Sequence, residues 1–178
     1  ITNAGNSVLQ VALSGKASRR LAQQTEQDAM TIEKLLKTIE YNPDYLNQFQ
    51  TPLVLIDEAS MVDIHSMYRI LKVLEKRPAR LVFVGDWAQL APVGPGLVYH
   101  KLMESKFVPK VELTQNFRST KNILEASEAI KAGKTFEHSK EVNIIECSSL
   151  DEMEKQSIRQ YELHLNTQSM HIIAARTR

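Results

Sequence analysis

The chain has 178 residues, of which 43% are hydrophobic and 24% are charged, a composition that excludes whole-chain disorder, a collagen repeat and a heptad rod. Its 22 lysines and arginines nearly balance its 21 aspartates and glutamates, so the net charge of +1 excludes a strongly basic protein and confines any nucleic-acid site to a local patch. The single cysteine, Cys147, excludes an intrachain disulfide and a cysteine-based zinc site. Without a signal peptide or an apolar run near the roughly 20 residues of a membrane span, we expect a soluble cytoplasmic protein.

Short apolar runs along the chain predict strands that are buried on both faces. In chain order they cover residues 8–13, 53–56, 81–84, 111–113, 143–145 and 171–174. Amphipathic helical patterns lie between these runs. Their expected caps are Thr31, Asp63, Ser119 or Thr120, and Ser149, the last forming a capping box with Glu152, and Gly133 is expected to end the third helix. Alternating strands and helices predict an α/β fold with a parallel sheet.

Polar clusters follow the first three predicted strands directly. They are Ser14-Gly15-Lys16, Asp57-Glu58 and Gly85-Asp86. In open α/β sheets the ligand crevice lies at the carboxyl ends of the strands, so clusters from separate strands can converge there. The sequence therefore predicts one functional site at this edge of the sheet.

The segment LVLIDEASMVD at residues 53–63 places two carboxylates after a buried strand. Asp57 can hold Mg²⁺, directly or through water, while Glu58 orients and deprotonates an attacking water, as nucleotide hydrolysis requires. Two solvated acids in a turn are the alternative interpretation, and the buried strand before them favours the catalytic one.

The segment LVFVGDWAQLAPVGPG at residues 81–96 adds a neutral amide, Gln89, which can donate to a phosphate oxygen and accept from water. A glycine- and proline-rich connector ahead of a helix is the alternative. Trp87 either stacks on a base or packs partly within its loop. Lys16 and the arginines at 19 and 20 form a small basic cluster, or simply a solvated helix face.

Five segments in sequence resemble motifs of the superfamily-1 DNA helicases, with the exodeoxyribonuclease V alpha chain, phage Dda and conjugative relaxase-helicases as the nearest look-alikes. IDEASMVD resembles the Walker B motif and GDWAQLAPVGPG resembles motif III. LTQNFRST at residues 113–120 resembles motif IV, ALSGKASRRL at 12–21 motif Ia, and TIEKLL at 31–36 motif Ib. The resemblance covers the chain to about Gly133 and implies a RecA-like P-loop NTPase fold.

This resemblance also implies roles for individual residues, with ATP and Mg²⁺ as cofactors of the intact parent protein. Asp57 would be the magnesium-side acid, Glu58 the general base, and Gln89 the contact to the γ-phosphate. Arg118 would be an arginine finger from a second RecA-like lobe, a role that suits a permanent cation with a bidentate fork. Gly85 and Asp86 would complete the nucleotide pocket, and the residues expected to hold the DNA backbone are Ser14, Gly15, Lys16 and Thr31.

The sequence departs from the family pattern in several places. It contains no GxxxxGK[ST] phosphate loop, since Gly133-Lys134-Thr135 has Glu128 where the first glycine belongs. Motifs V and VI are missing, and Glu33 stands where the family often has histidine. We therefore expect two incomplete RecA-like lobes, 1–105 and 106–178. We also expect this stretch alone to be inactive and to bind neither nucleotide nor metal.

Two functions follow from these observations. The first is the central portion of an ATP-dependent DNA helicase or translocase that moves on single-stranded DNA, for which other subunits of a nuclease-helicase complex are candidate partners. The second is a non-hydrolysing, vestigial RecA-like module that binds single-stranded DNA or a partner subunit. Retention of Asp57, Glu58, Gln89 and Arg118 favours the first for the parent protein.

Overall fold

A computed structural model describes residues 7–49, 51–75, 78–115, 117 and 119–165. They belong to two compact units, Ile1–Glu112 and Leu113–Arg178, and each unit is described by itself. The expected lobe boundary at residue 105 stays a prediction. None of the helices described is both long and apolar enough to cross a membrane.

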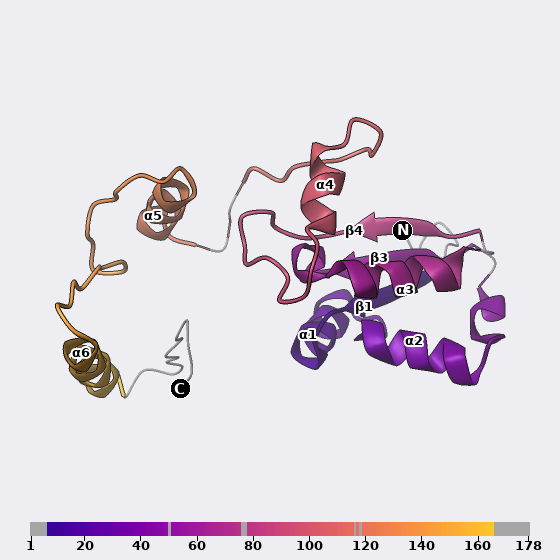
Figure 1. Ribbon diagram of the computed structural model, residues 1–178, viewed down its shortest axis with the longest axis horizontal. Coiled ribbons are helices and arrows are strands. Elements are labelled where there is room, and N and C mark those ends of the chain that lie inside the picture. The colour runs from indigo at the N-terminus through magenta and orange to yellow at the C-terminus, as the bar shows by residue number, and fades with distance from the viewer. Residues whose placement is uncertain (1–6, 50, 76–77, 116, 118, 166–178) are drawn as a thin grey trace. The chain divides into compact units, whose positions relative to one another are not determined.

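The first unit is built on a four-stranded parallel sheet with the strand order β2-β1-β3-β4 (Figure 1). The strands are β1 (Val8–Ala12), β2 (Ala29–Thr31), β3 (Leu53–Asp57) and β4 (Arg80–Phe83). Every neighbouring pair is parallel, and Ala12 at the end of β1 pairs with Thr31 of β2 on one side and Asp57 of β3 on the other. The expected α/β fold with a parallel sheet flanked by helices is confirmed.

Helices cover the sheet according to the alternation of side chains along its strands. On one face, α2 (Ile32–Tyr41) and α3 (Ile64–Leu74) pack on Val11 of β1 and Ile56 of β3, which are paired in register and fully buried. The opposite face of β1 meets α1 (Gly15–Thr25), where the buried Gln10 donates a hydrogen bond to Thr25 Oγ1 at 3.0 Å. Two 3₁₀ turns, η2 (Tyr45–Gln48) and η3 (Ala59–Met61), and the short helix α4 (Val98–Glu104) complete the unit.

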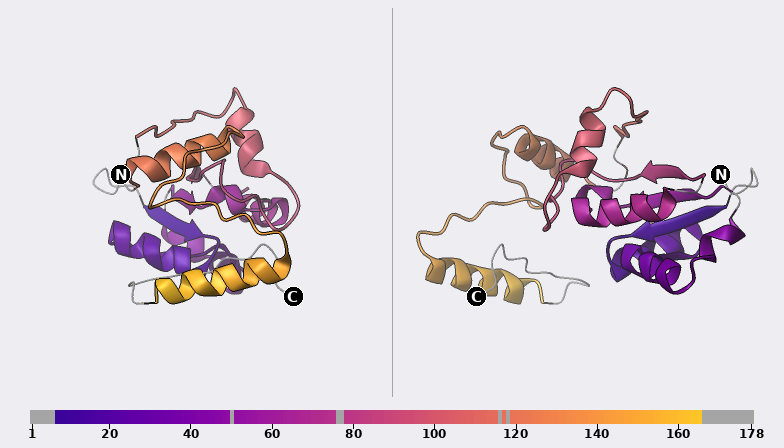
Figure 2. Two further views of the ribbon diagram at one scale, coloured as in Figure 1. Left: turned by 90° about the vertical axis from the view of Figure 1, so that its left-hand side faces the viewer. Right: turned by 45° about the vertical axis from the view of Figure 1, so that its right-hand side comes forward.

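The second unit contains α5 (Lys121–Lys131) and α6 (Leu150–Leu163), joined by irregular chain (Figures 1 and 2). The strands predicted at 111–113 and 143–145 are wrong, because both segments are irregular. Their apolar side chains are largely exposed, and no described strand pairs with them, so nothing supplies the ladder that stabilises so short a strand. The strand predicted at 171–174 lies outside the described residues.

The predicted helix starts are largely confirmed. Thr31 Oγ1 accepts from Lys34 N at 3.1 Å and Asp63 Oδ1 accepts from Ser66 N at 2.7 Å. Thr120 precedes α5, but its hydroxyl donates to Glu141 at 2.9 Å and does not cap the helix. Gly133 lies just beyond α5 with φ +65°, the left-handed conformation that ends helices.

The capping box predicted at the start of α6 is half formed. Ser149 Oγ accepts from Glu152 N at 3.2 Å, as expected. The carboxylate of Glu152, however, accepts from the backbone N–H of Ser148 at 2.8 Å, one residue before the expected donor. The Ser148 hydroxyl also donates to this carboxylate, and the hydrogen bonds from the hydroxyl and the N–H of Ser148 hold the pKa of Glu152 below its ordinary value.

Asp63→Ala should lower the stability of the first unit by about 1 kcal/mol at neutral pH, because the start of α3 loses its N-cap. Hydrogen bonds from Ser66 hold the pKa of Asp63 below its ordinary value. The carboxylate therefore stabilises the folded state above about pH 4, and this contribution disappears as the pH falls through the lowered pKa. Urea unfolding as a function of pH measures both effects. Asp63→Asn is the control, since it keeps the cap and removes only the pH dependence, and equal stability of Asp63→Ala and wild type at pH 7 would contradict the prediction.

Candidate functional site

The three polar clusters predicted from the sequence lie at neighbouring strand ends. Asp57 is the last residue of β3, and Ser14 follows β1, which pairs with β3. Val84 N donates to Ile56 O at 2.9 Å, which extends the contact of β3 with β4 up to Gly85. The ends of β1, β3 and β4 therefore form one continuous edge, as the sequence predicts, with Asp57 in the middle.

The turn after β3 holds Glu58 in an unusual backbone conformation. Glu58 has φ +53°, in the left-handed region that costs a side-chain-bearing residue roughly 1–2 kcal/mol. Ala59 N donates to Val84 O at 2.9 Å and Met61 N to Glu58 O at 3.1 Å, so backbone hydrogen bonds hold the turn in place. Ala59 is fully buried, whereas Asp57 and Glu58 keep partial exposure. The turn thus presents two adjacent carboxylates to solvent from a fixed backbone.

Gly85 fits against this turn with no room for a side chain. A Cβ at this position would lie 2.9 Å from Ser60 N and 3.2 Å from Ala59 N. Its carbonyl accepts a hydrogen bond from the hydroxyl of Tyr99 in α4 at 2.8 Å. Tyr99 is 7% exposed, and this burial, with the nearby charge of Asp86, raises the pKa of its phenol. Gly85 therefore contacts both the β3 turn and α4 while the residue itself stays exposed, and these contacts could not be predicted from the sequence.

Gly85→Ala should destabilise the first unit by about 1–3 kcal/mol, the usual cost of overpacking. The two nearest atoms that the new methyl group would meet, Ser60 N and Ala59 N, are backbone atoms, which cannot rotate away as a side chain does. Gly15→Ala is the matched control, because a Cβ there meets nothing within 4 Å and Gly15 begins α1. Urea unfolding of both variants measures the difference, and equal stabilities would show that the site does not need a glycine at residue 85.

A tight turn after Gly85 exposes Gln89. Asp86 Oδ1 accepts from Ala88 N at 2.9 Å, and Gln89 N donates to Asp86 O at 3.2 Å. The side chain of Gln89 is left exposed. Trp87 is 51% exposed, and its carbonyl is 2.9 Å from His100 Nε2 of α4. Sequence reasoning missed His100 as it missed Tyr99, because neither residue stands in a recognisable motif.

The far end of the same loop is attached to the start of α3. A Cβ on Gly94 would lie 2.2 Å from Asp63 Oδ2, and one on Gly96 would lie 2.8 Å from Ile64 Cβ. Ile64 N donates to Pro95 O at 2.9 Å. Gly96 also has φ +93°, which favours glycine. Both glycines therefore allow close packing between this loop and α3.

The residues predicted to bind DNA lie at two helix starts beside the carboxylate edge. Ser14 caps α1 by accepting from Ala17 N at 3.1 Å, and Thr31 caps α2 in the same way. Gly15 has open space around it and Lys16 is exposed. Because β1 and β2 are paired with Ala12 beside Thr31, both helices begin at the same sheet edge. Helix starts with free backbone N–H groups favour anions such as phosphate.

The arginine finger and the metal ligands are the remaining parts of the predicted site. Arg118 lies outside the described residues, so its predicted role stays a prediction. The described residues include no group of three or more His, Cys, Asp or Glu that could hold a metal ion. Asp57 alone supplies one of the one or two carboxylates that Mg²⁺ takes when substrate phosphates supply other ligands.

A comparison with family models and a comparison with curated proteins give results that agree with each other. Residues 1–149 match the family described as AAA domain. The chain is similar to the ATP-dependent RecD2 DNA helicase of Deinococcus radiodurans, with 34% identity over 130 residues, 69% of this chain and 17% of that protein. It is also similar to the RecBCD enzyme subunit RecD of Mycobacterium tuberculosis, with 31% identity over 146 residues, 68% of this chain and 25% of that protein. RecBCD enzyme subunit RecD of Haemophilus influenzae is 36% identical over 83 residues, 44% of this chain and 13% of that protein.

The chain thus spans a quarter or less of the length of these curated relatives. The matched region includes every described residue of the first unit, with the Asp57 turn, the Gly85 contact and both helix starts. The chain therefore belongs to the AAA domain family, and its resemblance to the RecD-type DNA helicases of superfamily 1 is confirmed.

Proposed function

We propose that this protein is part of an ATP-dependent DNA helicase that couples ATP hydrolysis to movement along single-stranded DNA. The observation that carries the proposal is the shared sheet edge, where the end of β3 with Asp57 and Glu58 lies directly beside the end of β1 with Ser14, Gly15 and Lys16. The residues proposed for ATP hydrolysis and the helix start proposed to bind phosphate are thus adjacent. A conformational change at the end of β3 would have to cross only the β1–β3 pair to reach the start of α1.

The carboxylates carry the hydrolytic part of the proposal. Asp57 would hold the Mg²⁺ of a bound ATP, and that ion would neutralise phosphate charge. Glu58 would accept the proton of the attacking water, for which its partly exposed carboxylate on a fixed turn is suited. Gly85 and Asp86 would line the nucleotide pocket, Gln89 would contact the γ-phosphate, and Arg118 would stabilise transition-state charge.

The helix starts carry the DNA part of the proposal. The backbone N–H groups at the start of α1, the Lys16 ammonium and the capped start of α2 at Thr31 are donors that bind phosphates without reading bases. A translocase needs such sequence-independent contacts. Because curated relatives are named as subunits of the RecBCD enzyme, we also propose partner subunits for this protein and a cytoplasmic location on DNA.

The test is ATP hydrolysis by the complete gene product with and without single-stranded DNA, combined with displacement of streptavidin from a biotinylated strand. We expect DNA to stimulate hydrolysis. Lys16→Ala should weaken DNA binding and make the negative slope of log K against log salt shallower by about 0.7, the value for one phosphate on a single strand. Lys101→Ala is the control, since Lys101 is an exposed lysine that pairs with Glu104 at 2.7 Å. DNA binding without hydrolysis would instead support a non-hydrolysing module, and failure of both would refute the proposal.

A further inference from the structure

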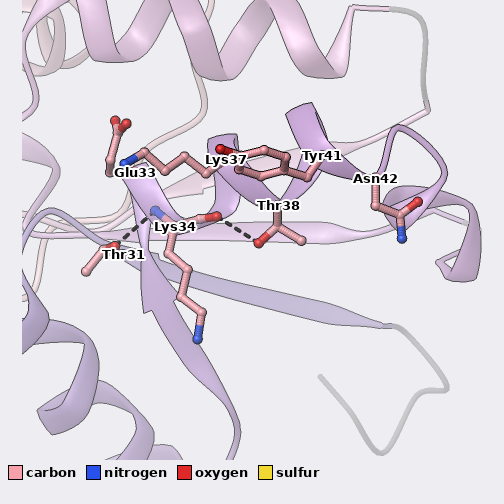
Figure 3. Close-up of a pocket in the computed structure, with 7 residues that line it drawn as sticks. All are labelled: Thr31, Glu33, Lys34, Lys37, Thr38, Tyr41 and Asn42. Carbon is pink, nitrogen blue, oxygen red and sulfur yellow. Dashed lines mark hydrogen bonds between the residues drawn. The ribbon is translucent and has the colours of Figure 1, made fainter.

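The outer side of α2 carries an open groove of about 560 Å³ (Figure 3). Of the residues that line it, only Thr31, at its start, has a role predicted from the sequence. The groove extends from Thr31 to Asn42, just beyond the end of the helix. At 1.5 Å per residue, the ten residues of α2 extend about 15 Å along the helix axis. Lys34, Lys37 and Tyr41 line it at helical spacing, so one face of α2 presents two cations and an aromatic ring.

The lining of this groove carries more positive than negative charge. Neither Lys34 nor Lys37 forms a salt bridge with a described residue. Glu33 is the one acid in the lining. Its carboxylate accepts from Arg69 of α3 at 2.8 Å, which lowers the pKa of Glu33, and the charge of Lys37 adds to this lowering. Because Arg69 is bonded to this acid, the two lysines leave a net positive charge that attracts an anionic partner.

Tyr41 is the second unusual feature of the groove. Its side chain is 86% exposed at the last residue of α2, although tyrosine rings normally bury most of their apolar surface. None of the ring contacts among the described residues involves it. An exposed ring beside cations is the combination with which proteins bind single strands, because phosphates contact the cations and bases stack on the ring.

We propose that this groove binds single-stranded nucleic acid, with phosphates at Lys34 and Lys37 and a base stacked on Tyr41. The proposal rests on the proposed function and extends the path of the strand from Thr31 along the outer face of α2. The 15 Å length accommodates at most about four nucleotides at 3.4 Å each. A compact anion could contact both lysines, which are neighbours on the helix, but it would leave the exposed ring of Tyr41 unused, whereas a single strand contacts the cations and the ring together.

The experiment measures binding of the full chain to a fluorescent oligothymidylate by anisotropy at several salt concentrations. Tyr41→Ala should weaken binding about 5- to 150-fold, the usual effect of removing the ring under one stacked base. Tyr41→Phe should bind as wild type, because it keeps the ring. The double variant Lys34→Ala/Lys37→Ala should lower the salt slope by about 0.7 for each phosphate that the lysines neutralise. Tyr68→Ala is the control, an exposed tyrosine that belongs to α3, and it should leave binding unchanged.

The outcomes separate this inference from the proposed function. If Lys16→Ala weakens binding while Tyr41→Ala does not, the proposed function stands and the groove proposal is overturned. If the wild-type chain binds no single strand, both fail. Tighter binding of a duplex or of a polyglutamate peptide than of the single strand would also overturn the proposal, since either would make the groove a site for another ligand. Because Tyr41 is exposed, its variants should keep the wild-type melting temperature, which confirms that a loss of binding is local.

Discussion

Glu58→Gln should remove most ATP hydrolysis from the complete gene product while ATP affinity stays close to that of wild type. The amide has nearly the shape of the carboxylate but cannot accept the proton of the attacking water, a loss that typically lowers kcat by about 10²–10⁴-fold. The turn should persist, because it is held by backbone hydrogen bonds from Ala59 and Met61 and not by the Glu58 side chain. Steady-state hydrolysis with DNA present gives kcat, and equilibrium binding of ATP gives the affinity.

Asp63→Asn provides the matched control for this change. It converts another carboxylate of the same segment into an amide, but at the cap of α3, where asparagine serves equally well. Its kcat should equal that of wild type. A Glu58→Gln variant with near-normal kcat would show that another group takes the proton and would remove Glu58 from the proposed mechanism.

Arg118→Ala should lower kcat by about 10³-fold or more, the usual range for arginine fingers in phosphoryl transfer. This prediction rests on the resemblance of LTQNFRST to motif IV, since Arg118 lies outside the described residues. Arg118→Lys should restore little of the activity, because an ammonium lacks the planar, bidentate fork of the guanidinium. Single-turnover hydrolysis separates this effect on chemistry from effects on ATP binding.

A nearby lysine allows the specificity of the Arg118 effect to be checked. Lys121 is an exposed cation at the start of α5, paired with Glu125 at 3.6 Å, and Lys121→Ala removes one positive charge from the same part of the chain. It should leave kcat unchanged. If Lys121→Ala and Arg118→Ala reduce kcat equally, the effect is one of general charge and the finger role is wrong.

The sequence predicts those parts of the fold that depend on local patterns. The strands that end at Ala12, Asp57 and Phe83 were recognisable because each is a short apolar run, and the caps at Thr31 and Asp63 because their side chains bond within the next turn. The prediction that β4 is buried on both faces is wrong, because its residues are alternately exposed and only partly buried. Strand β2 was missed since its three residues are too few to show periodicity. The segments at 111–113 and 143–145 have suitable composition but no pairing partner among the described strands, which composition alone does not reveal.

At the candidate site, too, the residues with a local sequence pattern could be predicted and the contacts without one could not. Asp57 and Glu58 could be predicted because they directly follow a buried strand, and the structure places them where expected. The left-handed backbone of Glu58 and the contacts of Tyr99 and His100 could not be predicted. Tyr99 and His100 act on the carbonyls of Gly85 and Trp87, 14 and 13 residues away, and such contacts leave no periodic signal in the sequence. Geometry at the site depends on these medium-range contacts, whereas motifs reveal only the reactive groups.

The attachment of the Gln89 loop at both ends limits how this residue can move. Tyr99 holds the loop at Gly85, and the first turn of α3 holds it through Ile64 and Pro95. Gln89 can therefore shift only by backbone rotation between these two points or together with α3. In the second case α2 is affected as well, because Arg69 of α3 is bonded to Glu33 of α2. A displacement that begins at Gln89 would thus reach α2 as the movement of one helix against another, without any change in the sheet between them.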